Sequence, residues 1–551
     1  MFNNARHVHI ENSAINFATQ SHGKLGLQLL LQKTAAGATH DSAQLESHAP
    51  CHPMTRKTVL RRIMDWANTT EHQSDILWLR GPAGAGKTSI LKTICSSCHE
   101  AGVLGGSFFF QRNVQQLNSP RCLVTTLAYQ LAIAFPELGD WINEVVGQDP
   151  SILDKTIEQQ LQKLVIDPAL ATDFARSHRR VVFVIDGLDE CVSEKPQCQI
   201  IRLINSIFKH HRAPFCFIIA SRPEPWIRDE FETDVFKHNL QQVSLEQSND
   251  TDQDIRTFLT QEFVDMCESP RHAYSMSDIT KPWPPPKDIN VLVHRASGQF
   301  IYAVTVLRFV DDPNYHPPDR LRLVLDIPLT TAQLNPLAEL DKLYMQIMGT
   351  CVDKKRTLDV LATLLTMLTL RQTSTLVTPF VWFPRLELLD VAGCLLGLGP
   401  NEAYRALRMI HSLVKISPLS NEEREKASFN AGYWHETINR PDAIAFHHKS
   451  FPDFLLDSRR SGCCFVDIDS AHRSTGLACL DIMKGLSSKQ PSRINYGQKF
   501  QYLSLRHFAH ISIQRHGVMH FSIGIATSVL RVPPQKRLYV GYENLNGVTT
   551  C

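Results

Sequence analysis

One eight-residue segment combines small residues with a lysine and a threonine at a spacing suited to binding phosphate. It matches G-x-x-x-x-G-K-[ST] and lies between apolar runs at 76–79 and 90–94. Small residues let the backbone curl so that N–H groups face phosphate oxygens, and a helix that follows presents its positive end to them. Average residue usage gives about 0.02 such matches in a chain of this length. The segment and the serine after it comprise Gly81, Pro82, Ala83, Gly84, Ala85, Gly86, Lys87, Thr88 and Ser89.

Two side chains of this segment are expected to act on the phosphates directly. Lys87 should reach the β and γ phosphates of a nucleotide, and the Thr88 hydroxyl should bind a Mg²⁺ ion that bridges phosphate oxygens. We therefore predict a site for ATP or ADP with Mg²⁺. Removal of Lys87 is expected to cripple nucleotide binding.

A second apolar run, at 181–185, ends in acids. Asp186 follows the run directly, and Asp189 and Glu190 come shortly after it. In a doubly wound sheet, a carboxylate at the C-terminal end of a strand lies beside the phosphate loop. Asp186 is therefore predicted to hold the water shell of Mg²⁺, and Asp189 or Glu190 to orient an attacking water. A strand followed by a solvated acidic turn is the alternative for this segment taken alone.

A third apolar run, at 215–220, is followed by Ser221 and Arg222. This spacing places Arg222 where a side chain could sense the γ-phosphate. A surface arginine is the alternative interpretation.

The elements that must position these residues follow from hydrophobic periodicity. Helical spacing at 58–66 leads into the first strand, and the strand-like runs are separated by segments long enough to hold helices. Strands that alternate with helices indicate an α/β fold with a parallel sheet. After residue 334 the spacing becomes mainly helical, as at 337–347 and 403–414. The predicted strands are 76–79, 106–110, 181–185, 215–220 and 240–245.

Length and composition describe an ordinary folded chain. At 551 residues it is too long for one core, so we expect about two to four packed units. Hydrophobic residues make up 43% and charged residues 20%, which argues against disorder and against a collagen-like class. The net charge is +2 and no long basic run occurs, so no nucleic-acid partner is predicted.

The same overview bears on the compartment. No stretch approaches the roughly 20 apolar residues that span a bilayer, and residues 1–20 lack a basic segment followed by an apolar one. The 14 cysteines lack the dense spacing of a secreted disulfide scaffold. We therefore expect a cytoplasmic protein without a membrane partner.

In this order, the motifs resemble the NACHT branch of the STAND P-loop ATPases, and their amino-acid sequences are similar to those of fungal NLR-like proteins. The resemblance covers roughly residues 35–510. It implies a five-stranded nucleotide domain, then a helical domain, then a winged-helix domain that closes on the nucleotide. Besides the phosphate loop, the residues that carry it are 40–43, 51–53, 55–56, 186–191, 221–225, 296–303 and 340–344.

The domain boundaries that follow place an N-terminal segment of unclear structure at 1–50 and the NACHT domain at 51–250. A small helical domain is expected at 251–335, the winged-helix domain at 336–470, and a helical segment with an unassigned tail at 471–551.

The resemblance also implies a role for His448. Residues 446–455 are similar to the NACHT segment whose histidine contacts the β-phosphate of ADP, and His448 is the matching position. An imidazole that donates to a phosphate oxygen would tie the winged-helix domain to the diphosphate. A packing histidine beside His447 is the alternative. The proline of the family's G-x-P motif is absent from 298–301, so its adenine contact is not carried over.

Three functions are compatible with these features. The first is a signalling switch that is closed with ADP and that opens or self-associates through the NACHT domain with ATP, hydrolysing it slowly. The second is a continuously cycling AAA+-like ATPase, which would use Asp186, Glu190 and Arg222 in the same arrangement. The third is a truncated binding module that nucleotide merely stabilises. The third is favoured by the lack of any repeat with a period of 20–50 residues and by the unfamiliar residues 518–551.

Overall fold

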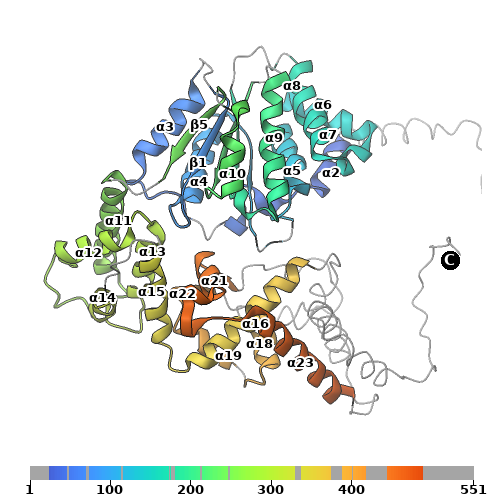
Figure 1. The fold of residues 1–551 in the computed structure, drawn as a ribbon. Helices are drawn as coiled ribbons and strands as arrows, with labels where there is room; N and C mark the ends of the chain where they lie inside the picture. The colour runs from blue at the N-terminus through green and yellow to red at the C-terminus, as the bar shows by residue number, and fades with distance from the viewer. Residues whose placement is uncertain are drawn as a thin grey trace, which may run out of the picture.

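A five-stranded parallel sheet with helices on both faces forms the first half of the computed structural model, and a second, mainly helical half follows it (Figure 1). The tail at 518–551 lies outside the described residues. The structure describes residues 24–45, 49–69, 74–112, 114, 116–172, 174, 180–210, 214–236, 238–245, 249–328, 337–373, 388–399, 401–416 and 444–487.

The sheet confirms the predicted α/β class, and each predicted strand is present. The strand order is β2-β3-β4-β1-β5, and every neighbouring pair is parallel. All residues of β3 and β4 are buried, as a strand covered by helices on both faces requires. The strands are β1 (Ile76–Arg80), β2 (Leu104–Phe109), β3 (Val181–Asp186), β4 (Phe215–Ser221) and β5 (Leu240–Ser244).

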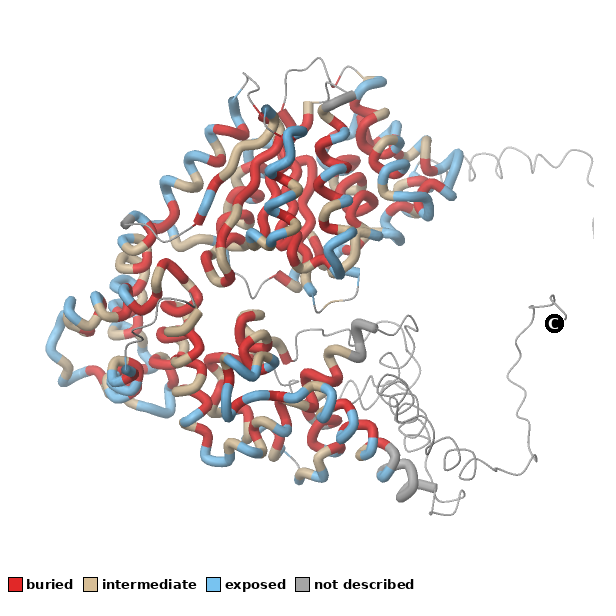
Figure 2. Tube along the Cα trace, in the orientation of Figure 1, coloured by how far each residue is buried: buried red, intermediate tan, exposed pale blue. Residues whose placement is uncertain are grey.

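Alternate residues of each strand enter two different cores. In β1, Ile76 and Trp78 pack on the face that carries α5, α6 and α9, whereas Leu77 and Leu79 pack on the face that carries α3 and α4. The buried residues gather along these strands (Figure 2). The helices of this half are α2 (Leu25–Gln32), α3 (Lys57–Asn68), α4 (Lys87–Glu100), α5 (Leu123–Ala134), α6 (Pro136–Gln148), α7 (Ile157–Leu161), α8 (Asp167–Ala171), α9 (Glu194–His210) and α10 (Pro225–Phe231).

Part of the predicted N-terminal segment packs on this half. The backbone N–H of Leu27, in α2, donates to Oδ1 of Asn143 in α6 at 3.1 Å. The N–H of His40 donates to the Ser107 hydroxyl of β2 at 3.0 Å. Because β2 is an edge strand, the contact of His40 helps to cover an otherwise open edge.

The second half packs around one apolar cluster that runs from Ile255 to Cys479. In Figure 1 it lies below the sheet, with α21 on the side that faces the sheet. None of the described helices combines the length and apolarity needed to cross a membrane. The elements are α11 (Asn249–Glu268), α12 (Pro286–Ala296), α13 (Phe300–Val310), α14 (Pro317–Leu325), α15 (Ala338–Gly349), α16 (Lys354–Thr373), α18 (Leu388–Leu395), α19 (Glu402–Arg408), β6 (Val414–Ile416), β7 (Ile444–Phe446), α21 (Ser450–Leu455), α22 (Ser458–Ser461) and α23 (Ile468–Ser487).

The helical interpretation of 403–414 needs one correction. The helix α19 ends at Arg408, and Val414 begins β6, which pairs antiparallel with β7. Leu407, Ile410 and Val414 are all buried, so the periodic pattern marks the core correctly. The backbone at Val414 is extended because β6 pairs with β7, a strand distant in the sequence. Hydrophobic periodicity carries no information about such pairing.

Candidate nucleotide-binding site

The phosphate loop joins the C-terminal end of β1 to the start of α4. Gly84 and Gly86 have φ angles of 77° and 91°, a region that side chains with a Cβ rarely adopt. Gly86 is the residue that precedes α4, and Lys87, Thr88 and Ser89 form the first turn of that helix. The loop therefore leads directly into a helix N-terminus, whose first backbone N–H groups have no partner within the helix and suit an anion.

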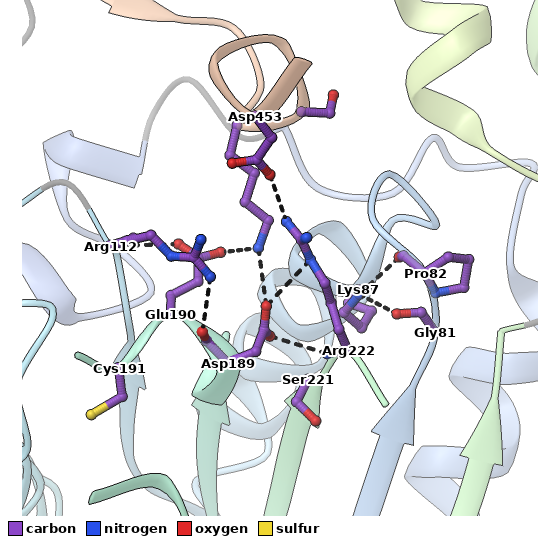
Figure 3. Close-up of polar contacts among 12 residues, drawn as sticks. Gly81, Pro82, Lys87, Arg112, Asp189, Glu190, Cys191, Ser221, Arg222 and Asp453 are labelled. Atoms are coloured by element: carbon purple, nitrogen blue, oxygen red, sulfur yellow. Dashed lines mark hydrogen bonds and ion pairs between the residues drawn. The ribbon is translucent and has the colours of Figure 1, made fainter. Parts of the chain in front are cut away.

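Lys87 is buried at the mouth of the loop. Its Nζ donates to the carbonyl oxygens of Gly81 at 2.7 Å and Pro82 at 2.9 Å (Figure 3). Burial lowers the pKa of Lys87 to about 8, against the opposing charge of Asp189. The loop's own carbonyls thus hold the side chain in place near the phosphate position.

Thr88 and Asp186 meet where a metal ion is predicted. The Thr88 hydroxyl donates to Oδ2 of Asp186 at 2.6 Å, and Oδ1 of Asp186 is buried with no hydrogen-bond partner. Burial raises the pKa of Asp186 to about 6, although the Thr88 hydrogen bond lowers it. A hydroxyl and an orphaned carboxylate oxygen are ligands that fit Mg²⁺. Within the described ranges, no three His, Cys, Asp or Glu side chains form a ready-made metal site.

Asp189 and Arg222 are held together because β3 and β4 are neighbours and both end at this edge of the sheet. The N–H of Arg222 donates to Oδ1 of Asp189 at 3.0 Å, and its Nε lies 3.3 Å from Oδ2. Burial would raise the pKa of Asp189, but the charges of Lys449, Lys87 and Arg222 lower it to about 2. Asp189 is therefore a fixed anion within a group of cations.

Glu190, the next residue, is bound on both sides. Its Oε2 accepts the backbone N–H of Arg112 at 3.2 Å, and its Oε1 pairs with Nζ of Lys449. Arg112 also donates from Nη2 to the carbonyl of Asp189 at 3.2 Å (Figure 3). The residues after β2 and the second half of the chain thus both reach the acidic turn.

Residues 444–455, which we call the α21 segment, bring two charged side chains to this edge. Nη2 of Arg222 donates to Oδ2 of Asp453 at 3.2 Å, and Nζ of Lys449 lies 3.5 Å from Oδ2 of Asp189. Lys449 precedes the first turn of α21 and Asp453 stands four residues later, so both lie on one face of the helix. Sequence reasoning assigned no role to either residue.

His448, the predicted phosphate contact, has a defined proton position. Its Nδ1 accepts the N–H of Ser450 at 3.1 Å and lies 2.6 Å from the Ser450 hydroxyl, which is 2.7 Å from the hydroxyl of Tyr344. Since an amide only donates, the neutral ring carries its proton on Nε2. His448 can therefore donate from Nε2, and its neighbour Lys449 is the residue that contacts the acids.

Arg56 connects the phosphate loop with the second half. Its Nη2 donates to the carbonyl of Ala85 at 2.8 Å, and its Nη1 donates to the Thr251 hydroxyl of α11 at 3.0 Å. Its guanidinium lies 4.9 Å from the ring centroid of Phe300, at the start of α13. The sequence marked Arg56 only as part of the family resemblance and gave no sign of these contacts.

Two protein-family models match parts of the chain that include this site. Residues 55–222 match the Nephrocystin 3 N-terminal family, and residues 141–309 match the KAP family P-loop domain. The first match contains the phosphate loop, the acidic turn and Arg222. No curated protein matches the chain significantly.

Two solved structures from Drosophila are similar over a long stretch of chain. One, ORC bound to DNA, is 12% identical, covers 70% of this chain and 92% of its own, and has a TM-score of 0.35. The other, ORC bound to AT-rich DNA and Cdc6, is 10% identical, covers 97% and 82%, and has a TM-score of 0.24. Neither bears on ligand or partner at these scores. The phosphate loop, its place between β1 and α4, and the two matching families identify the chain as a P-loop NTPase.

Proposed function

We propose that this P-loop NTPase is a nucleotide-operated switch of the NACHT type, closed with ADP and opened or self-associated with ATP. The observation that carries the proposal is the ion pair between Arg222, at the sheet edge, and Asp453, in the α21 segment. It links the helical half to the place where a γ-phosphate would be sensed. In this proposal 51–250 is the nucleotide domain, 251–335 a helical domain and 336–470 the winged-helix domain.

Each site residue has a role in binding. The amides of residues 81–86 and of Thr88 and Ser89 would surround the phosphates, with Lys87 as the neutralising cation. Thr88 and Asp186 would hold Mg²⁺, which when bound neutralises charge on the β and γ phosphates. His448 would donate its Nε2 proton to the β-phosphate of ADP, so that the α21 segment senses the diphosphate. Its hydrogen bond from Ser450 supports this role because it fixes the required tautomer.

Slow hydrolysis fits the same arrangement. The oxygen of a water would bond to the γ-phosphorus while the bond to the β–γ bridging oxygen breaks, and ADP would leave with that electron pair. Glu190 would accept the water's proton, with Arg222 beside the γ-phosphate. Asp189 accepts the N–H of Arg222, and despite its burial the charges of Lys449, Lys87 and Arg222 lower its pKa to about 2, so it is better placed to position Arg222 than to accept a proton.

The test uses the full chain and fluorescent ADP and ATP analogues. We expect Lys87→Ala to abolish binding, while Lys195→Ala, which removes an exposed lysine of α9, leaves it intact. Hydrogen exchange in the α21 segment should be slow with ADP and faster with a non-hydrolysable ATP analogue. Equal exchange with both nucleotides contradicts a switch. Phosphate release sustained above about 1 per second would indicate a cycling ATPase instead.

A further inference from the structure

We propose that Lys449 is a built-in inhibitor of hydrolysis: in the closed chain its ammonium holds the carboxylates of Glu190 and Asp189, so that Glu190 cannot accept a proton from water. The inference rests on the proposed nucleotide switch and adds a specific residue that keeps hydrolysis silent. Lys449 thereby acts through Glu190 and is a positioning residue rather than a catalytic one.

Three of the four carboxylate oxygens accept a hydrogen bond, and the fourth, Oδ2 of Asp189, lies within ion-pair distance of two cations. For Glu190, Oε1 pairs with Lys449 and Oε2 accepts the N–H of Arg112 at 3.2 Å. For Asp189, Oδ1 accepts the N–H of Arg222 at 3.0 Å, and Oδ2 lies 3.3 Å from Nε of Arg222 and 3.5 Å from Nζ of Lys449. A carboxylate whose two oxygens already face donors is a poor proton acceptor. Of these partners, only Lys449 belongs to the α21 segment and can leave with it.

The charges alternate in sign across the interface. Five side chains form a series in which each contacts oppositely charged neighbours. In order, they are Glu190, Lys449, Asp189, Arg222 and Asp453. The exposed fraction of the side chain is 1% for Asp189, in the middle of the series, and 17% and 31% for Glu190 and Asp453 at its two ends, so the buried anion is flanked by partly exposed charges. In a site that is partly shielded from water, such a series of ion pairs is stable only when all of its members are present. Removing one member leaves a buried charge unpaired.

The charge state of Lys449 agrees with this role. Burial would lower its pKa, but Glu190 and Asp189 raise it above the usual value, so the side chain remains an ammonium at neutral pH. A γ-phosphate carries more negative charge than either carboxylate and would compete with both acids for Lys449 and with Asp453 for Arg222. Hydrolysis would therefore have to wait until the triphosphate displaces Lys449 from Glu190, and this displacement would limit the rate.

The experiment measures single-turnover hydrolysis of ATP and equilibrium binding of ADP by the full chain. Lys449→Met removes the charge and keeps an unbranched apolar side chain of similar length. We expect hydrolysis to rise by at least about tenfold, since general-base contributions of 10² or more become accessible. Adding Glu190→Gln should remove the gain. Lys355→Met, which changes an exposed lysine of α16, serves as the matched control and should behave as the wild type.

The outcomes separate the two proposals. If ADP binds and Lys449→Met hydrolyses ATP at the wild-type rate or more slowly, Lys449 is not an inhibitor, whereas the switch proposal stands. If the wild type binds neither nucleotide, the proposed function itself is wrong. Should Lys449→Met fail to fold, Asp453→Asn provides the second test, because a loosened α21 segment withdraws Lys449 and should also raise hydrolysis. An unchanged rate in folded Asp453→Asn overturns the inference.

Discussion

Arg222 and Asp453 lie 231 positions apart in the chain, and Nη2 of the first donates to Oδ2 of the second at 3.2 Å. The same guanidinium also contacts Asp189 through Nε. One side chain therefore holds an anion of each half, and a ligand that attracts Arg222 must weaken at least one of these contacts. This shared cation gives the two halves a physical route for coupling.

Asp453→Asn tests the strength of that contact. Loss of the carboxylate should leave Arg222 paired with Asp189 only, so amides of α21 should exchange about tenfold faster, which corresponds to about 1.4 kcal/mol. Hydrogen exchange followed by mass spectrometry measures this directly. Asp359→Asn changes an exposed carboxylate of α16 and should have no effect. Identical exchange in the two variants would show that the ion pair does not hold the halves together.

Gly84→Ala should damage the phosphate loop for two separable reasons. A Cβ at Gly84 would lie 2.1 Å from Cγ2 of Ile301, and the φ of 77° disfavours a side chain. A Cβ at Gly86 would meet nothing within 4 Å, so Gly86→Ala carries only the backbone strain, about 1–2 kcal/mol.

We therefore expect weaker nucleotide binding in both variants, with the larger loss in Gly84→Ala, and partial recovery in the double variant Gly84→Ala with Ile301→Ala. Titration with a fluorescent nucleotide compares them. Gly147→Ala, on an exposed helix position with open space around it, is the control. If the Ile301→Ala change restores no binding, the contact between the new Cβ and Ile301 is not what weakens binding in Gly84→Ala.

Arg320→Met should destabilise the helical half strongly. Arg320 pairs with Asp312 at 2.9 Å, their side chains are only 3% and 4% exposed, and the guanidinium lies 3.9 Å from the ring centroid of Phe309. Removing one partner leaves a buried charge, so unfolding should be easier by about 3–5 kcal/mol. Urea denaturation gives the value. Arg322→Met, at a side chain 73% exposed, should change it by less than about 0.5 kcal/mol.

His447 should make stability depend on pH. Burial and then the charge of Arg308 lower its pKa to about 4, despite the hydrogen bond to the His411 carbonyl. The unfolded chain takes up the proton near pH 6.5 and the folded chain only near 4, so stability falls as the pH drops through this window.

His447→Gln should therefore lose less stability than the wild type between about pH 7.5 and about pH 5, by about 1 kcal/mol after solvent screening. Urea midpoints at the two pH values measure the difference. Parallel losses in the two proteins would show that His447 does not titrate differently on folding.

The sheet and the core of the site could be predicted because their signals are local. The strands are unbroken apolar runs, and Lys87, Thr88, Asp186 and Arg222 each follow a strand end at short spacing. The structure places Thr88 and Asp186 in contact, 98 positions apart, because β1 and β3 end at the same edge of the parallel sheet, with β4 between them.

The contacts of the α21 segment could not be predicted in the same way. Lys449 meets Glu190 from 259 positions away, and neither periodicity nor a short motif records that distance. The family resemblance implies a role for His448, one residue before Lys449. The structure shows that Lys449 is the side chain that contacts Glu190 and Asp189. Val414 illustrates the same limit for secondary structure, since its partner Phe446 lies in a distant strand.

The position of β1 between β4 and β5 has a consequence for synthesis. Both partners lie well over a hundred residues downstream, so the strand that leads into the phosphate loop emerges from the ribosome with no neighbour to pair with. At about 5–20 residues per second, the wait is on the order of 10 s. During that time Ile76–Arg80, an apolar strand with open edges, is exposed to other nascent chains, so a chaperone that covers β1 would protect this protein from mispairing.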